Sequence, residues 1–217
     1  MAVSVIKKHK KTKLIPWNNS TKVLILKVII HIAALAPLIN LYYLAFNDEL
    51  GADPVEQVIH FTGIGAFNLL LLTLLISPIA KKFRQGFLMQ TRRLMGLYAF
   101  TYALFHVINF LAFDLQFAWA LFLSEILKRP YITIGMLAFL LLCALALTSF
   151  NRIKARMGQH WQKLHNLSYL IILLVAVHFY WSVKSELTSP LFYLFLCFVM
   201  LFFRYKKLKS LISSLFR

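Results

Sequence analysis

The stretch HWQKLHNLSYLIILLVAVHFYW, from His160 to Trp181, decides the fold class. It begins with polar and basic residues and continues into an apolar run long enough to cross a bilayer as a helix. Of the 217 residues in the chain, 60% are hydrophobic, and the mean hydropathy is +0.73. This apolar share is far above that of a soluble domain. The sequence therefore predicts a membrane protein.

Further apolar blocks predict an all-α membrane protein built as a six-transmembrane-helix bundle. No series of segments has the alternating pattern of a membrane barrel. Glycines inside the blocks, such as Gly63 and Gly135, permit close helix contacts. The bundle is expected over residues 23–204, between basic tails at 1–22 and 205–217. Its spans are expected at 23–46, 61–80, 94–113, 131–150, 164–183 and 190–204.

The distribution of charge predicts how the bundle is oriented. The chain has 24 Lys and Arg residues against 7 Asp and Glu residues, for a formal charge of +17. All the basic residues except Lys128, Arg129 and Lys184 lie near the two ends of the chain or in the loops 81–93 and 151–163. The positive-inside rule places these segments, and both termini, in the cytoplasm. Because the charge is clustered between apolar blocks, it marks topology and not a nucleic-acid partner.

Histidines stand out among the residues inside the predicted spans, which hold no Asp or Glu and have Lys and Arg only near their ends. At 1.5 Å per residue, His106 lies about 18 Å and His178 about 21 Å from the cytoplasmic edges of their spans. Two neutral imidazoles at matched depth can bind a haem iron from opposite sides. Either histidine alone could instead be a packed core residue, but the absence of other charge at depth favours ligation.

Three other histidines keep alternative roles at this stage. His165, at the cytoplasmic start of the fifth predicted span, could hold a second haem or another redox group, although on an ideal helix it lies about 220° around from His178. His31, in the first span, suits an interhelical hydrogen bond or a contact with a quinone. His60, at the predicted outer boundary of the second span, either caps that span or touches a haem edge.

Several long phrases carry a resemblance to a known family. In order along the chain they are LGADPVEQVIHFTG, TRRLMGLYAFTYALFH, RPYITIGMLAFLLLCALALTS, HWQKLHNLSYL and HFYWSVK. Together they resemble the haem-binding membrane subunit of bacterial periplasmic methionine-sulfoxide reductase systems. This family belongs to the ferric-reductase-like transmembrane group, and the resemblance covers nearly the whole chain from the first predicted span onward.

The resemblance implies a haem b protein of the bacterial inner membrane, which acts as a non-catalytic electron-transfer subunit of an oxidoreductase complex. Its expected partner is a periplasmic molybdopterin-containing methionine-sulfoxide reductase catalytic subunit, which repairs oxidised periplasmic proteins. FMN is implied as a further cofactor, and the quinone pool or a cytosolic flavin reductase as the electron donor. The family's haem histidines fall on His106, His165 and His178.

The third predicted span departs from the wider group. NADPH oxidases carry two histidines on each of two helices and so stack two haems, whereas this span has only His106. Arg92 and Arg93 stand at its cytoplasmic start instead. Their guanidinium groups suit haem propionates, a flavin phosphate or anionic lipid headgroups better than iron. His165 therefore lacks an obvious partner for a second bis-histidine haem.

Two other functional classes remain compatible with the chain. A quinone-linked b-type cytochrome that serves another acceptor would share every feature except the family phrases. A small-solute or metal transporter is disfavoured, because proton-coupled transporters and ion pumps usually use carboxylates buried in the membrane. The sequence shows no G-x-G-x-x-G after a strand, so the chain is not expected to take hydride from a nicotinamide itself.

Overall fold

The structure is a computed structural model that describes residues 18–183, 186–205, 207, 209 and 213. The predicted tails at 1–22 and 205–217 therefore lie largely outside the described residues. Within the described residues the secondary structure is helical, without strands. The helices are α1 (Asn19–Phe46), α2 (Pro54–Lys82), α3 (Arg92–Asn109), α4 (Trp119–Lys128), α5 (Pro130–Leu147), α6 (Asn151–Met157), α7 (Gln159–His165), α8 (Ser168–Ser182) and α9 (Thr188–Phe203), with a 3₁₀ turn at Gly86–Thr91 before α3 and a π turn at Phe110–Asp114 after it.

Long apolar helices make this a multi-pass membrane protein. Among the described residues, five segments are long and apolar enough to cross a bilayer, and α9 is apolar but has only 16 residues. Large apolar side chains on α1 and α9 point away from the protein, as lipid-facing residues do. They include Leu24, Ile32, Ile39, Phe192, Phe195 and Phe198. The five segments are Asn19–Phe46, Pro54–Lys82, Gly86–Asp114, Pro130–Leu147 and Gln159–Ser182.

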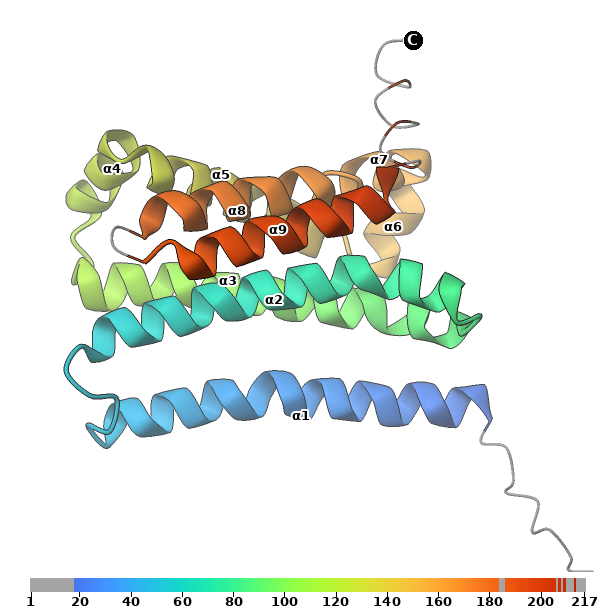
Figure 1. Ribbon diagram of the computed structural model, residues 1–217, viewed down its shortest axis with the longest axis horizontal. Helices are drawn as coiled ribbons and strands as arrows, with labels where there is room; N and C mark the ends of the chain where they lie inside the picture. Colours follow the sequence, from blue (N-terminus) through green and yellow to red (C-terminus); the bar gives the residue numbers. More distant parts are fainter. Residues whose placement is uncertain (1–17, 184–185, 206, 208, 210–212, 214–217) are drawn as a thin grey trace, which may run out of the picture.

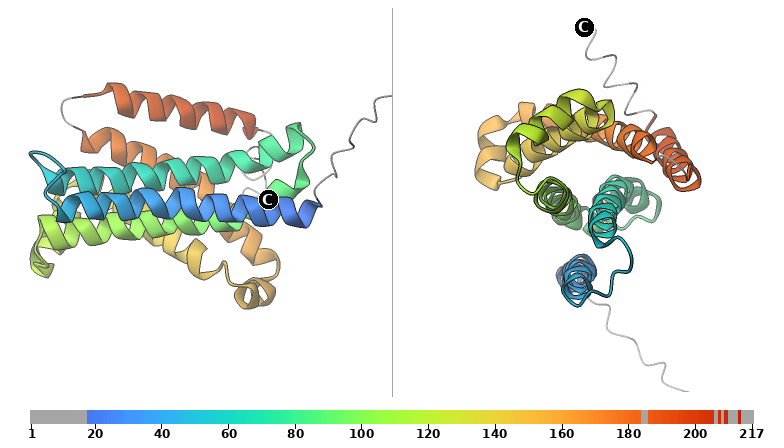
Figure 2. Two further views of the ribbon diagram at one scale, coloured as in Figure 1. Left: turned by 90° about the horizontal axis from the view of Figure 1, so that it is seen from below. Right: turned by 90° about the vertical axis from the view of Figure 1, so that its left-hand side faces the viewer.

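The long helices run antiparallel in layers (Figure 1; Figure 2). The end-on view shows α2 and α3 in one layer and α5, α8 and α9 in a second, with α1 on the outer side of the first. α2 packs along α3, and α5 packs along α8. A buried core joins the layers, and its most enclosed side chains include Phe67, Leu74, Ile171, Ile172 and Met200.

Polar contacts hold α1 against α3. The ring of His31 hydrogen-bonds to the Tyr98 hydroxyl, which confirms the interhelical role predicted for this histidine. The Tyr102 hydroxyl donates to the carbonyl of Ala34 at 2.7 Å, and the Tyr42 hydroxyl donates to Oδ1 of Asn109 at 2.9 Å. These bonds satisfy hydroxyl groups that would otherwise be buried without partners.

The two helices that support the candidate site, α2 and α5, each begin with proline. Pro54 is the first residue of α2, after the N-cap Asp53, whose side chain accepts a hydrogen bond from the Glu56 backbone N–H at 2.9 Å. Pro130 is the first residue of α5. Proline suits this position because the first N–H groups of a helix have no partner within it.

The structure corrects several predicted boundaries. α2 begins at Pro54 and not near residue 61, so His60 lies inside the helix and does not cap it. The predicted span 164–183 falls within the long segment Gln159–Ser182, which a two-residue turn interrupts, because α7 ends at His165 and α8 begins at Ser168. The sequence predicted neither α4 nor the short helices α6 and α7. Hydropathy reports apolar length and not backbone direction, so a break next to an apolar run leaves little signal.

Candidate functional site

His106 on α3 and His178 on α8 meet between the two helix layers. Their ring centroids are 6.2 Å apart, and the ring planes are inclined at 84°. Each histidine lies near the end of its helix, since α3 ends at Asn109 and α8 ends at Ser182. The sequence predicted the two rings at a matched depth, and the structure brings them together.

Each ring is oriented by a backbone carbonyl on a neighbouring helix. Nδ1 of His106 lies 2.9 Å from the carbonyl oxygen of Ile59 on α2, and Nδ1 of His178 lies 2.7 Å from that of Tyr131 on α5. A carbonyl can only accept, so both Nδ1 atoms carry the proton and both Nε2 atoms carry the free lone pair. Metal-binding histidines are usually fixed by a hydrogen bond of this kind.

A glycine lies against each ring, one helical turn after the carbonyl residue. A Cβ atom at Gly135 would stand 2.6 Å from Nδ1 of His178, and one at Gly63 would stand 3.0 Å from Nδ1 of His106. The rings therefore occupy space that any other residue would fill. Ile59 precedes His106 by 47 residues, and Tyr131 precedes His178 by the same number. The same arrangement of carbonyl, glycine and histidine therefore occurs twice in the chain.

The spacing of this pair fits two axial ligands of a haem. A metal–imidazole bond of about 2 Å on each side of an iron places the ring centroids roughly 6 Å apart, close to the 6.2 Å found here. The described residues contain no group of three or more His, Cys, Asp or Glu side chains that could hold a metal ion. A pair of histidines suits haem, because the macrocycle supplies the remaining ligands.

His165 lies apart from this pair, at the end of α7 and just before the start of α8. Its Nε2 lies 3.1 Å from the hydroxyl oxygen of Thr148, and its ring stacks on Trp161 with centroids 4.0 Å apart. The indole N–H of Trp161 donates to the Thr148 carbonyl at 2.9 Å. The structure therefore gives His165 its own surroundings at the other end of α8.

The neighbouring arginines Arg92 and Arg93 diverge, although the sequence treated them as one group. Nη1 of Arg93 donates to Oδ1 of Asn151 on α6 at 2.8 Å, and its side chain is exposed. Arg92 is half-buried and lies within electrostatic range of Tyr169 and Arg204. Of these two arginines, therefore, only Arg92 lies toward the junction of α8 and α9.

A cleft of about 770 Å³ lies between α1 and α2. Its size falls in the range of small-molecule sites. Its lining is mostly apolar, with polar groups from His60, Asn68 and Tyr102 and, at the start of α2, from Asp53, Glu56 and Gln57. Ala33 and Pro37 also line it, and because proline has no N–H, the Ala33 carbonyl lacks its usual helical partner. Tyr102 stands one helical turn before His106, which brings the cleft close to the histidine pair.

Comparison with known proteins identifies the family. Residues 62–176 match the family model described as the ferric reductase like transmembrane component, a range that includes His106 and His165. The protein-methionine-sulfoxide reductase heme-binding subunit MsrQ of Cronobacter sakazakii is 42% identical over 186 residues, which cover 85% of this chain and 93% of that protein. This chain belongs to the MsrQ family. The resemblance carried by the sequence phrases is thereby confirmed. No solved structure matches this MsrQ-family chain.

Sequence reasoning missed the groups that orient the histidines of this MsrQ-family chain. Ile59 and Tyr131 act through their carbonyl oxygens, which every residue type possesses, so their identity carries no signal. Gly63 and Gly135 indicated close helix contacts but not which side chain they face. The equal spacing of 47 residues was a usable signal, because it repeats from one helix pair to the next.

Proposed function

We propose that this chain is the haem-binding electron-transfer subunit of a protein-methionine-sulfoxide reductase system in the bacterial inner membrane. The pairing of His106 with His178 carries the proposal, because both rings are fixed through Nδ1 and both leave Nε2 for a metal. When bound, haem b supplies one-electron redox chemistry at a potential set by its axial ligands and surroundings. The similarity to a heme-binding MsrQ protein supports the same function.

The chain's own groups would set the properties of this centre. The carbonyls of Ile59 and Tyr131 hold the two imidazoles in the metal-binding tautomer and make them stronger donors. The aromatic ring of Tyr131 packs beside that of His178, with centroids 6.2 Å apart, within a largely apolar bundle. These apolar surroundings exclude water and lower the local dielectric constant, which strengthens the effect of nearby charges.

The proposed topology has six spans with both termini in the cytoplasm. Figure 1 supports it, since α1 begins and α9 ends at the same end of the bundle. The basic loops 81–93 and 151–163 join helices at that end, as the positive-inside rule requires. His106 and His178 then lie in the outer half of the membrane. Electrons would leave on the periplasmic side.

The proposed electron acceptor is the periplasmic molybdopterin-containing catalytic subunit, which would reduce methionine sulfoxide while this chain performs no substrate chemistry. All seven acidic residues lie in the outer connections or next to them, at Asp48, Glu49, Asp53, Glu56, Asp114, Glu125 and Glu186. Such an acidic surface would attract and orient a partner with a basic docking face.

Electron entry from the cytoplasm is proposed at the inner end, around His165 and Arg92. A flavin such as FMN, or a second redox group held there, would accept electrons from a cytosolic flavin reductase. Arg92 would provide positive charge beside such a cofactor. Arg93, which is exposed and bonded to Asn151, would contact its outer edge.

The quinone pool is the second proposed donor, and the cleft between α1 and α2 is the place where its headgroup fits. The free carbonyl of Ala33 can accept from a quinol hydroxyl, while the apolar lining suits the ring. We expect Ala33→Phe to fill the cleft and lower quinol-driven reduction without lowering haem content. Unchanged quinol-driven reduction in this variant would remove the cleft from the pathway.

The direct test of the proposal is the haem content of purified variants. His106→Ala and His178→Ala should each lose most of the b-type absorbance, whereas His31→Ala, which removes a histidine bonded to Tyr98, should keep it. His178→Met separates loss of a ligand from loss of folding, because thioether ligation raises the reduction potential. Full haem retention in both alanine variants would reject the ligand assignment. Electron transfer to the purified reductase subunit distinguishes this function from that of a cytochrome serving another acceptor.

A further inference from the structure

Two arginines lie within electrostatic range of each other at the inner ends of α3 and α9. Arg92 is the first residue of α3, and Arg204 directly follows α9. Both side chains are half-buried, and they lie within electrostatic range of each other and of Tyr169 on α8. Nη2 of Arg204 donates to the carbonyl of Leu74 on α2 at 2.8 Å. Four helices therefore converge on this arginine pair.

Buried polar atoms without partners occur on the helix turns next to this arginine pair. Of the five such side-chain atoms among the described residues, four are Ser77 Oγ, Ser168 Oγ, Tyr169 OH and Arg204 Nε. Ser77 lies one turn beyond Leu74 on α2, and Ser168 precedes Tyr169 on α8. Leaving a buried hydrogen-bonding atom unsatisfied is unfavourable, so these four atoms suit a ligand that forms several hydrogen bonds here.

No carboxylate side chain neutralises the two arginines. All seven acidic residues of the chain lie toward the outer end of the bundle. Lys207 adds a further positive charge, with Nζ 5.7 Å from the centre of the Tyr169 ring. Unpaired charges are unfavourable in partly buried surroundings, and like charges placed together increase that cost. The ligand that suits this place is therefore an anion that accepts several hydrogen bonds.

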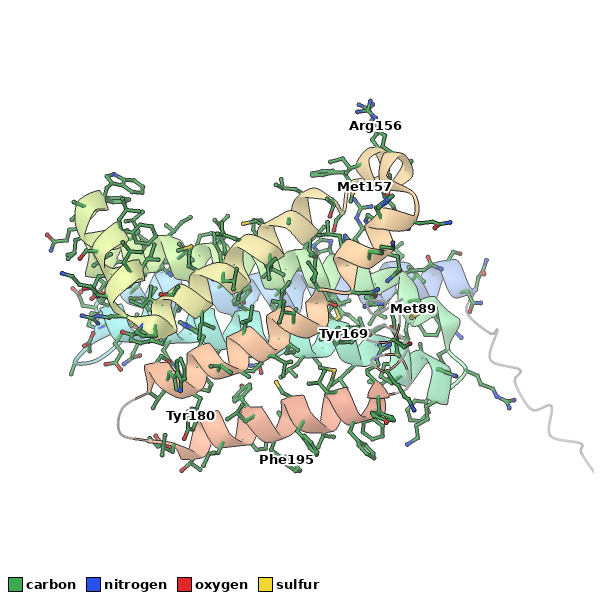
Figure 3. The ribbon with its side chains drawn as sticks, turned by 90° about the horizontal axis from the view of Figure 1, so that it is seen from above. Met89, Arg156, Met157, Tyr169, Tyr180 and Phe195 are labelled. Carbon is green, nitrogen blue, oxygen red and sulfur yellow. The ribbon has the colours of Figure 1, made fainter. Side chains whose placement is uncertain are left out.

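We propose that Arg92, Arg204 and Tyr169 form a binding site for the phosphate group of a membrane-associated ligand. A phosphate accepts hydrogen bonds from planar guanidinium groups and from hydroxyls, which are the donors gathered here. Figure 3 shows Tyr169 at the inner end of α8, at the level of the lipid headgroups in the proposed topology. The site does not depend on the proposed haem ligands, but its flavin alternative rests on the inner-end cofactor site proposed above.

Two sources of this phosphate share the same chemistry. One is the headgroup of an anionic phospholipid, whose acyl chains would lie against the exposed Phe202 and Phe203 of α9. The other is FMN, which would lie toward His165, since Arg92 is within electrostatic range of that histidine. In both cases the two guanidinium groups hold the phosphate.

The test uses the full chain with the substitutions Arg92→Gln and Arg204→Gln. Arg156→Gln is the matched control, because it removes the same charge from an exposed side chain that points away from the bundle (Figure 3). Phosphatidylglycerol and FMN are titrated separately, and binding is followed by native mass spectrometry and thermal unfolding. Loss of one charge-assisted contact should weaken binding about tenfold or more, while Arg156→Gln binds like the wild type.

The direction in which Arg92→Gln changes the melting temperature separates a loss of ligand binding from a defect in folding. Without phosphate ligand, Arg92→Gln relieves repulsion from Arg204 and should be neutral or stabilising. With ligand, the same variant should melt below the wild type. A response only to phosphatidylglycerol identifies a lipid site, and a response only to FMN identifies a flavin site. Equal binding by the wild type and both variants, or an equal loss in Arg156→Gln, would overturn the proposal.

Discussion

The ring of His178 occupies the place where a side chain at Gly135 would begin. A Cβ atom there would lie 2.6 Å from Nδ1 and 2.7 Å from Cε1 of the ring, closer than packed atoms approach. The Tyr131 carbonyl that fixes this ring lies one helical turn before the glycine. The position of one proposed ligand therefore depends on the absence of a side chain on the opposite helix.

Gly135→Ala should displace His178 and disturb the proposed haem site. Overpacking of this kind costs about 1–3 kcal/mol, so we expect a lower haem content and altered low-spin electron paramagnetic resonance. Gly63→Ala should have a weaker effect, because the contact with the His106 ring is longer, at 3.0 Å.

Gly96→Ala is the control for these variants. Its nearest atom, Cγ2 of Thr73, would be 3.7 Å from the new Cβ, which is ordinary packing. It should keep the wild-type spectrum. If Gly135→Ala and Gly96→Ala gave the same spectrum, the close approach of the His178 ring to Gly135 would not matter for haem binding.

Tyr42→Phe should loosen α1 without removing haem. The hydroxyl of Tyr42 is the donor for Oδ1 of Asn109, which is only 2% exposed, and Nδ2 of Asn109 already lacks a partner. Losing the donor should cost about 1–3 kcal/mol, seen as a lower melting temperature in detergent. Tyr43→Phe, at a neighbouring exposed position, should melt like the wild type.

His165→Ala should impair electron entry from the cytoplasmic side. It should leave unchanged much of the absorbance spectrum of the haem proposed between His106 and His178. The distance along α8 separates His165 from the pair of His106 and His178, so the two sites should respond independently. Thr148→Val removes only the hydroxyl next to Nε2 of His165 and should have a smaller effect. Wild-type turnover in His165→Ala would reduce this histidine to a packing residue.

Labelling with a membrane-impermeant maleimide should distinguish the two ends of the bundle. Glu49→Cys, in the exposed turn after α1, should react from the periplasmic side, whereas Arg152→Cys on α6 should react only after the membrane is permeabilised. The native Cys143 and Cys197 lie within α5 and α9 and should react slowly in both cases. Reaction of both new cysteines from the same side would reject the proposed topology.

The main helices could be predicted from the sequence because apolar length is a strong signal. α1 and α5 were placed within a few residues, whereas the turn after His165 was missed because Leu164 and Leu167 on either side keep the apolar character continuous. α4 was missed because ten residues are too few to resemble a span. These errors concern short helices and turns, which leave little trace in composition.

The candidate site was predictable only in part. His106 and His178 could be selected because histidine is rare and costly inside a membrane. Arg204 was the last residue of the predicted span 190–204, and nothing in its sequence neighbours predicts that it turns back to bond Leu74 on α2. Such contacts arise from packing between distant segments, which local patterns do not record.

The carbonyl anchors of the two histidines have a consequence for how this protein tolerates change. A carboxylate partner can be lost through a single codon, but the oxygens of Ile59 and Tyr131 belong to the main chain and persist whatever residue is encoded there. Random substitution can therefore disrupt the proposed redox centre by replacing a histidine or a glycine, or by displacing a whole helix. It cannot remove the carbonyl oxygens that accept the two hydrogen bonds.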